Sequence, residues 1–137
     1  MAGKLNIVGA GYGLDAAIGR ATVSARTMYL ALLTVIPAAN ITPASMVEYN
    51  VAGYSRQVCA MSVPAGTPRV TSNTATITYG PLTGANNATQ IVGWALVSTA
   101  SGTTGDVVAQ GDWSTARIPA ANDQLTVSPG AVTVSVD

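Results

Sequence analysis

The sequence predicts a mainly β protein: an antiparallel β-sandwich of the jelly-roll or immunoglobulin-like kind, with one short N-terminal helix and an extended N-terminal arm. Two observations predict this class. First, seven or eight short runs of strand-forming residues alternate with turn residues, at intervals typical of such sandwiches. Second, one of these runs is apolar on both faces, so it needs a cover on each side.

The stretch from Gln90 to Trp113 is the centre of this prediction. Side chains of a strand alternate between its two faces. Both faces of this run are therefore largely apolar, with Ile91, Gly93, Ala95 and Val97 on one face and Val92, Trp94 and Leu96 on the other. Turn residues follow at 99–106, and a second run then places Val107, Ala109 and Trp113 on one face. The two runs predict a hairpin, and its cover is either a second sheet or another subunit.

The remaining segments are predicted from glycine content and periodicity. Residues 1–13 contain four glycines and predict an extended arm, whereas 14–137 predict a single β-sandwich domain. Leu14, Ala17, Ile18 and Ala21 recur at helical spacing, so we expect a helix of about two turns lying against the β core. Further strands are predicted at 27–33, 54–63, 74–79, 124–128 and 131–136, the last two forming a hairpin around Pro129 and Gly130.

The composition points to a protein whose surface is covered by other protein. Charged residues are 9% of the chain, against about 25% in ordinary soluble domains. No uninterrupted apolar run reaches about 18 residues, which excludes a bilayer-spanning helix, and we expect no membrane partner. Six basic residues balance six acidic ones without a basic cluster, so direct nucleic-acid binding is not expected.

The residues that usually carry catalysis or bind metals are scarce. There is no histidine, which excludes Ser-His-Asp and Cys-His pairs and imidazole ligands. Cys59 lies in an apolar run and is expected to be a buried, inert thiol. Asp106 and Asp112 could form an acid pair or a calcium site, but Asp106 is also an ordinary turn residue. We therefore expect no enzyme activity, no catalytic residue, no cofactor and no metal site.

Glycines and aromatic residues allow two further interpretations. Gly9, Gly11 and Gly13 resemble part of a dinucleotide fingerprint, but their spacing and the missing βαβ unit argue against it. The aromatic side chains could form a sugar-stacking platform if two coplanar rings were exposed, whereas buried rings would serve as core or interface anchors. These side chains are Tyr12, Tyr29, Tyr49, Tyr54, Tyr79, Trp94 and Trp113.

Several short stretches, in this order, resemble small virion proteins of tailed bacteriophages that are described as head decoration (cement) or tail fibre proteins. They are residues 27–34 (TMYLALLT), 53–57 (GYSRQ), 72–75 (SNTA), 79–81 (YGP), 95–97 (ALV), 100–102 (ASG), 105–106 (GD), 122–123 (ND) and 129–130 (PG). The resemblance covers roughly Leu14 to Asp137 and implies a noncatalytic, β-rich subunit of a phage particle. It carries over no active-site residue, and the segment before Leu14 lies outside it.

The sequence therefore predicts a virion structural protein, assembled in the cytoplasm of the bacterial host, and most specifically a capsid decoration or cement subunit. Its expected partners are the major capsid protein or other virion subunits, and further copies of itself in a homo-oligomer. The residues expected to anchor the arm are Leu5, Ile7 and Val8, and those expected to pack the core or the self-interface are Tyr29, Leu32, Trp94 and Leu96. A tail ring or fibre-base component and a virion-displayed host-glycan binding module are the alternatives.

Overall fold

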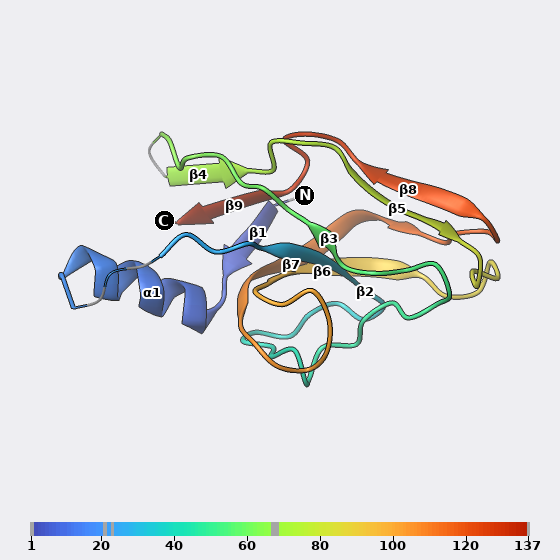
Figure 1. Cartoon of the computed structure of the whole chain (residues 1–137), viewed down its shortest axis with the longest axis horizontal. Helices are drawn as coiled ribbons and strands as arrows, with labels where there is room; N and C mark the ends of the chain where they lie inside the picture. The colour runs from blue at the N-terminus through green and yellow to red at the C-terminus, as the bar shows by residue number, and fades with distance from the viewer. Residues whose placement is uncertain (1, 21, 23, 67–68, 137) are drawn as a thin grey trace.

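The computed structural model describes residues 2–20, 22, 24–66 and 69–136, and within these ranges it contains nine strands and one helix (Figure 1). The predicted mainly β fold with a short N-terminal helix is confirmed. No helix among the described residues is long and apolar enough to cross a membrane. The elements are β1 (Ala2–Leu5), α1 (Ile7–Ala17), β2 (Tyr29–Leu33), β3 (Gln57–Val58), β4 (Arg69–Ser72), β5 (Ile77–Leu82), β6 (Ile91–Val97), β7 (Val107–Arg117), β8 (Asp123–Val127) and β9 (Thr133–Val136).

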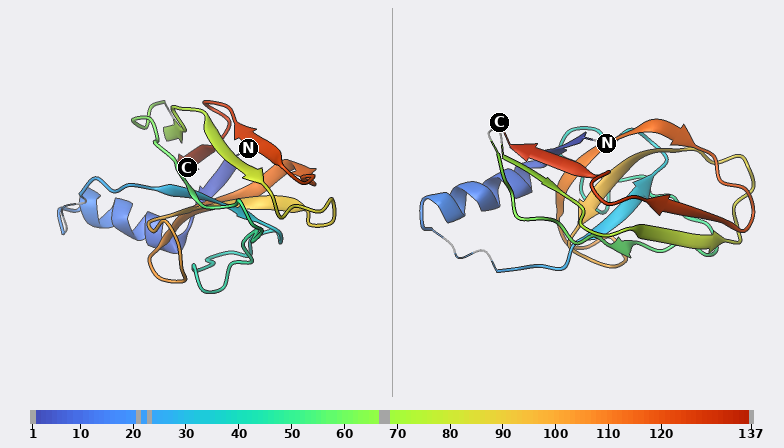
Figure 2. Two further views of the ribbon diagram at one scale, coloured as in Figure 1. Left: turned by 45° about the vertical axis from the view of Figure 1, so that its right-hand side comes forward. Right: turned by 90° about the horizontal axis from the view of Figure 1, so that it is seen from above.

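The strands form one large sheet and one small one. The large sheet has seven strands in the order β3-β2-β6-β7-β1-β9-β4, and β5 pairs with β8 in the small sheet. The described strand pairs are antiparallel except β1 with β9, which run parallel. Bridges from Met61 to Asn73 and from Ala65 to Val70 join the chain after β3 to the β4 edge, so the large sheet curls back towards itself. The fold is sandwich-like with unequal layers (Figure 2).

The double-faced character predicted for β6 is confirmed, and both covers come from the same chain. On one face, Trp94 and Leu96 pack in the main core cluster with Ile77, Tyr79 and Val127 of the small sheet. On the other face, a second cluster of Ala31, Leu33, Ala95, Val97 and Val107 is covered by Ile41 and Met46. Both covering residues lie in the long connection between β2 and β3, and the first part of this connection, cyan to teal in Figure 1, runs below the sheet.

Two register shifts change the predicted faces of the central hairpin. One lies between Ile91 and Gly93 and the other between Leu96 and Val97. At the first shift, two steps along β6 correspond to five along β7, and at the second, one step along β6 corresponds to two along β7. Such irregularities change which face later side chains point to. Ile91 consequently packs with Trp94 rather than with Ala95, and Val107 packs on the face opposite to Ala109. The hairpin itself is as predicted, with β6 antiparallel to β7.

Within the predicted extended arm over residues 1–13, the described residues 2–13 form a strand and the beginning of a helix. β1 is an inner strand, with Gly3 opposite Gly111 of β7 and Val134 of β9. A Cβ at Gly3 would clash with the Trp94 ring, so glycine lets the backbone cross this large buried side chain. Gly3 and Gly9 therefore reflect close packing within the fold, whereas a Cβ at Gly11 or Gly13 would meet nothing within 4 Å. Deleting this segment would remove part of the sheet rather than release a dispensable arm.

The helix is displaced towards the N-terminus relative to the predicted 14–21. It begins after Asn6, whose Oδ1 accepts a hydrogen bond from the Val8 N–H at 3.2 Å, as an N-cap does. Asn6 is itself 3% exposed, and its Nδ2 donates to the Ile41 carbonyl at 2.8 Å. The start of α1 is thus fixed to the connection that covers the second core cluster.

The predicted C-terminal hairpin is wrong, because β8 and β9 belong to different sheets. Asn73, which is 2% exposed, directs the turn between them. Its Oδ1 accepts from the Val132 N–H at 2.9 Å, and its Nδ2 donates to the carbonyls of Ser128 at 3.0 Å and Ala75 at 2.9 Å. A buried side chain thus makes the contacts that separate the two strands.

Candidate functional site

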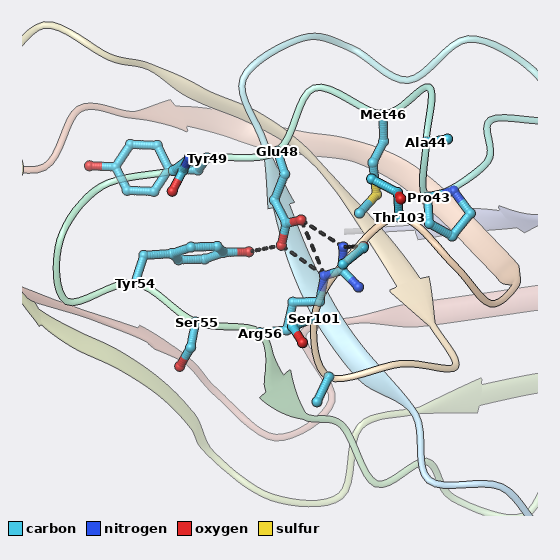
Figure 3. Close-up of a pocket in the computed structure, with 13 residues that line it drawn as sticks. Pro43, Ala44, Met46, Glu48, Tyr49, Tyr54, Ser55, Arg56, Ser101 and Thr103 are labelled. Atoms are coloured by element: carbon cyan, nitrogen blue, oxygen red, sulfur yellow. Dashed lines mark hydrogen bonds and ion pairs between the residues drawn. The ribbon is translucent and has the colours of Figure 1, made fainter.

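A polar network lies beside an open pocket of about 440 Å³ (Figure 3). The pocket lies between the connection from Pro43 to Arg56 and the β6–β7 loop around Gly102. A bridge between Leu33 and Glu48 pairs the connection with the end of β2 and brings Glu48 to the pocket wall. The network consists of Glu48, Tyr54 and Arg56.

Arg56 is the centre of the network, with a side chain that is 3% exposed. Its Nε donates to both carboxylate oxygens of Glu48, at 2.9 and 3.2 Å, and its Nη2 donates to Glu48 Oε2 at 2.8 Å. Nη1 reaches the carbonyl and the hydroxyl of Thr99 at 3.1 and 3.2 Å, and Nη2 also reaches the Gly102 carbonyl at 2.8 Å. All five guanidinium N–H donors therefore have acceptors within the protein.

Tyr54 completes the network from the side of the sheet. Its hydroxyl donates to Glu48 Oε1 at 2.8 Å and accepts from the Leu32 N–H at 3.0 Å. Burial, and then the negative charge of Glu48, hold the pKa of Tyr54 far above its ordinary value, so the hydroxyl stays protonated. Its ring stacks on that of Tyr79 with centroids 5.8 Å apart, and the Tyr79 hydroxyl donates to the Leu30 carbonyl at 2.8 Å.

The arrangement of Glu48, Tyr54 and Arg56 supports a structural role. The guanidinium of Arg56 has no N–H left for a ligand anion, and Glu48 accepts from both Arg56 and Tyr54. The network joins two loops to β2, so it stabilises the pocket wall. In the described part of the chain, no group of three or more histidine, cysteine, aspartate or glutamate residues is placed to hold a metal ion.

The other candidate residues lie in packing or ion-pair positions. Asp106 accepts from the Tyr12 hydroxyl at 2.7 Å and from Arg26 Nη1 at 3.1 Å, whereas Asp112 is exposed on β7. The Arg26 guanidinium also lies 4.3 Å from the centre of the Tyr12 ring. Cys59 is 2% exposed, and burial raises the pKa of its thiol to about 11. A thiol with this pKa stays protonated near neutral pH and is a poor nucleophile.

The predicted interface residues fall into two groups. Leu32 and Trp94 are fully buried and Leu96 is 4% exposed, so these three pack the core of the subunit. Leu5, Val8 and Tyr29 are half-buried, whereas Ile7 is 66% exposed. Contacts of these residues with another subunit stay a prediction.

The prediction also missed two exposed side chains, Leu14 and Ile18. Their spacing predicted a face buried against the core, but they are 62% and 58% exposed. α1 instead places Gly9 against β7, where a Cβ would clash with the Val108 carbonyl. The glycine at position 9 was the available signal, because close helix packing requires a small residue.

Five of the seven aromatic side chains considered for a sugar-stacking platform pack in or against the core, and Tyr12 and Tyr29 are half-buried. Trp94 and Tyr79 are fully buried and Tyr49 is 1% exposed. Trp113 is half-buried against the main core cluster, and Tyr54 stacks on Tyr79 inside the molecule. These rings therefore act as core anchors.

Comparison with known protein families assigns the chain to a family. The family model of the podophage GP4 fiber I protein gp80 matches residues 13–135, which leaves β1 and the first six residues of α1 outside the match. The chain belongs to the gp80 family. A gp80-family chain is a structural component of a tailed-phage virion, as the sequence predicted, but the match does not point specifically to head decoration. No curated protein matches the chain.

Proposed function

We propose that this gp80-family chain is a noncatalytic subunit of the tail fibre, where it associates with other virion components and with copies of itself. The family match over residues 13–135 carries this proposal, because the family description names a fibre protein. The family match favours a tail component, which the sequence allowed as an alternative, over a capsid decoration subunit.

The structure supports a noncatalytic role for the pocket. Its charged side chains, Glu48 and Arg56, are bound to each other and to loop carbonyls. A general base or an anion-binding guanidinium would need an unoccupied acceptor or donor facing the pocket. Arg56 instead donates to the Thr99 and Gly102 carbonyls of the β6–β7 loop, which suits a subunit that must present a constant surface.

Immunogold electron microscopy of intact particles tests the location. Antibodies raised against the purified chain should place gold at the fibres, and serum from before immunisation gives the background. Gold distributed over the head would refute the fibre proposal and restore the capsid decoration alternative. Because the antibodies recognise the unmodified chain, the result does not depend on a tag that could disturb assembly.

A further inference from the structure

Helix α1 presents its apolar side to solvent. Ile7 and Leu14 of α1, and Ile18, the C-cap residue directly after it, are 66%, 62% and 58% exposed. At about 100° per residue, these three and Gly11 lie within about 60° of one another around the helix axis, and Gly9 lies about 180° away. The helix therefore shows the inverse of the pattern expected for a surface helix, which normally turns its polar side outward.

The helix cannot rotate to bury this side against its own sheet. Gly9 contacts Val108 so closely that a Cβ would not fit, and the Tyr12 hydroxyl is bound to Asp106 at 2.7 Å. The Asn6 cap fixes the beginning of the helix. The apolar stripe of Ile7, Gly11, Leu14 and Ile18 is thus held outward, and Figures 1 and 2 show α1 extending beyond the end of the sheets.

We infer that the occupant of this stripe is the same stripe of a second copy, with the two α1 helices packed antiparallel. The inference deepens the proposed function, because it names one contact by which fibre subunits associate. The spacing of residues 7, 11, 14 and 18 alternates four, three and four, which is the spacing of a coiled-coil seam. Antiparallel alignment places Ile7 opposite Ile18 of the partner, and Gly11 opposite Leu14 of the partner.

Side-chain size favours the antiparallel arrangement over the parallel one. In the antiparallel pair, each Leu14 enters the space that Gly11 of the other copy leaves open, and nothing in the subunit lies within 4 Å of a Cβ at Gly11. A parallel pair would align glycine with glycine and leave a gap in the seam, which costs stability. The same patch serves both copies, as a two-fold contact requires.

Charge and area set the expected strength of the contact. The stripe carries no charged residue, so two copies meet without like-charge repulsion. With eleven residues, α1 is only about 17 Å long. Such a helix pair buries less than the roughly 800 Å² per partner of a standard stable interface. We therefore expect a dimer that dissociates on dilution and that further contacts reinforce in the particle.

Sedimentation velocity of the full chain over a range of concentrations tests the contact. The unmodified chain should show a concentration-dependent dimer, and Leu14→Lys should remain monomeric at every concentration. Val63→Lys is the matched control, because Val63 is 87% exposed and lies outside α1. It should dimerise like the unmodified chain, and circular dichroism should show that both variants are folded. Equal dimerisation of the Leu14→Lys variant would overturn the inference.

Cross-linking tests the antiparallel alignment. Ile7→Cys and Ile18→Cys variants are mixed and treated with a short bis-maleimide, which adds to one thiol at each end. Antiparallel pairing predicts many cross-links between an Ile7→Cys chain and an Ile18→Cys chain, and few between two chains of the same variant. More cross-links between chains of the same variant would overturn the alignment. The unmodified chain is the control, because Cys59 is 2% exposed.

The two proposals fail separately. A chain that stays monomeric and forms no cross-link refutes the α1 contact and leaves the fibre location standing. Gold labelling on the head refutes the fibre location, whereas the dimer would still be measured in solution.

Discussion

Replacing Asn73 by alanine should strongly destabilise the fold, because this side chain bonds three backbone groups. Val132 is fully buried, so leaving its N–H without an acceptor costs about 2 kcal/mol. The carbonyls of Ser128 and Ala75 belong to exposed residues that water can reach, and losing their bonds costs about 1 kcal/mol each. We therefore expect the free energy of unfolding to fall by about 4 kcal/mol, a large part of the 5–15 kcal/mol typical of a domain.

Urea unfolding followed by tryptophan fluorescence measures this loss. Asn86→Ala is the matched control, because Asn86 is exposed and its side chain accepts one local hydrogen bond from the Ala88 N–H at 3.2 Å. The control should lose less than about 1 kcal/mol. Asn73→Asp should be at least as unstable as Asn73→Ala near neutral pH, because a carboxylate cannot donate to the two carbonyls. A loss below about 1 kcal/mol in Asn73→Ala would refute the role assigned to this residue.

Two further predictions concern the buried polar groups. Arg56→Met should lower the free energy of unfolding by about 3–5 kcal/mol, because it leaves the Glu48 carboxylate without its cation, and Glu48→Gln in the same chain should recover part of this loss in urea titrations. Strictly additive effects of the two substitutions would contradict the coupling. The pKa of Cys59 is raised by burial from its ordinary value of 9.0 to about 11, so its contribution to stability is complete below about pH 9 and is lost as the pH rises towards 11. Unfolding titrations across this range should show a shallower decline for Cys59→Ala than for the unmodified chain, and identical slopes would show that the thiol does not titrate in this way.

Local periodicity predicted most of the strands but not β1 or β4, and long-range contacts decided how the strands pair. The alternation around Trp94 was readable because a strand repeats every two residues, and the hairpin followed from the turn residues after it. The register shift beside Ile91 depends on the partner strand, so no local pattern shows it. The separation of β8 from β9 depends on Asn73, which lies 59 residues before Val132.

The site was less predictable than the fold for the same reason. Glu48 and Arg56 lie in a connection without periodicity, and only the folded chain brings them to Thr99 and Gly102. Leu14 and Ile18 were visible as part of a helical repeat, whereas Ile7 and Gly11 were placed in the extended arm. The direction in which the exposed stripe points depends on the contact between Gly9 and Val108. A glycine-rich segment can form a free arm or a tightly packed strand. Here the contact of Gly3 with the Trp94 ring shows that it forms a packed strand.

The position of β1 has a consequence for biosynthesis. The earliest described strand lies between β7 and β9, and β9 is the last described strand in chain order. While the polypeptide is still on the ribosome, β1 has only one of its two neighbours, and its other edge must wait for residues 133–135. The nascent chain can thus complete its large sheet only after residues 133–135 have emerged, which until then leaves an unpaired strand edge open to chaperones or to neighbouring nascent chains.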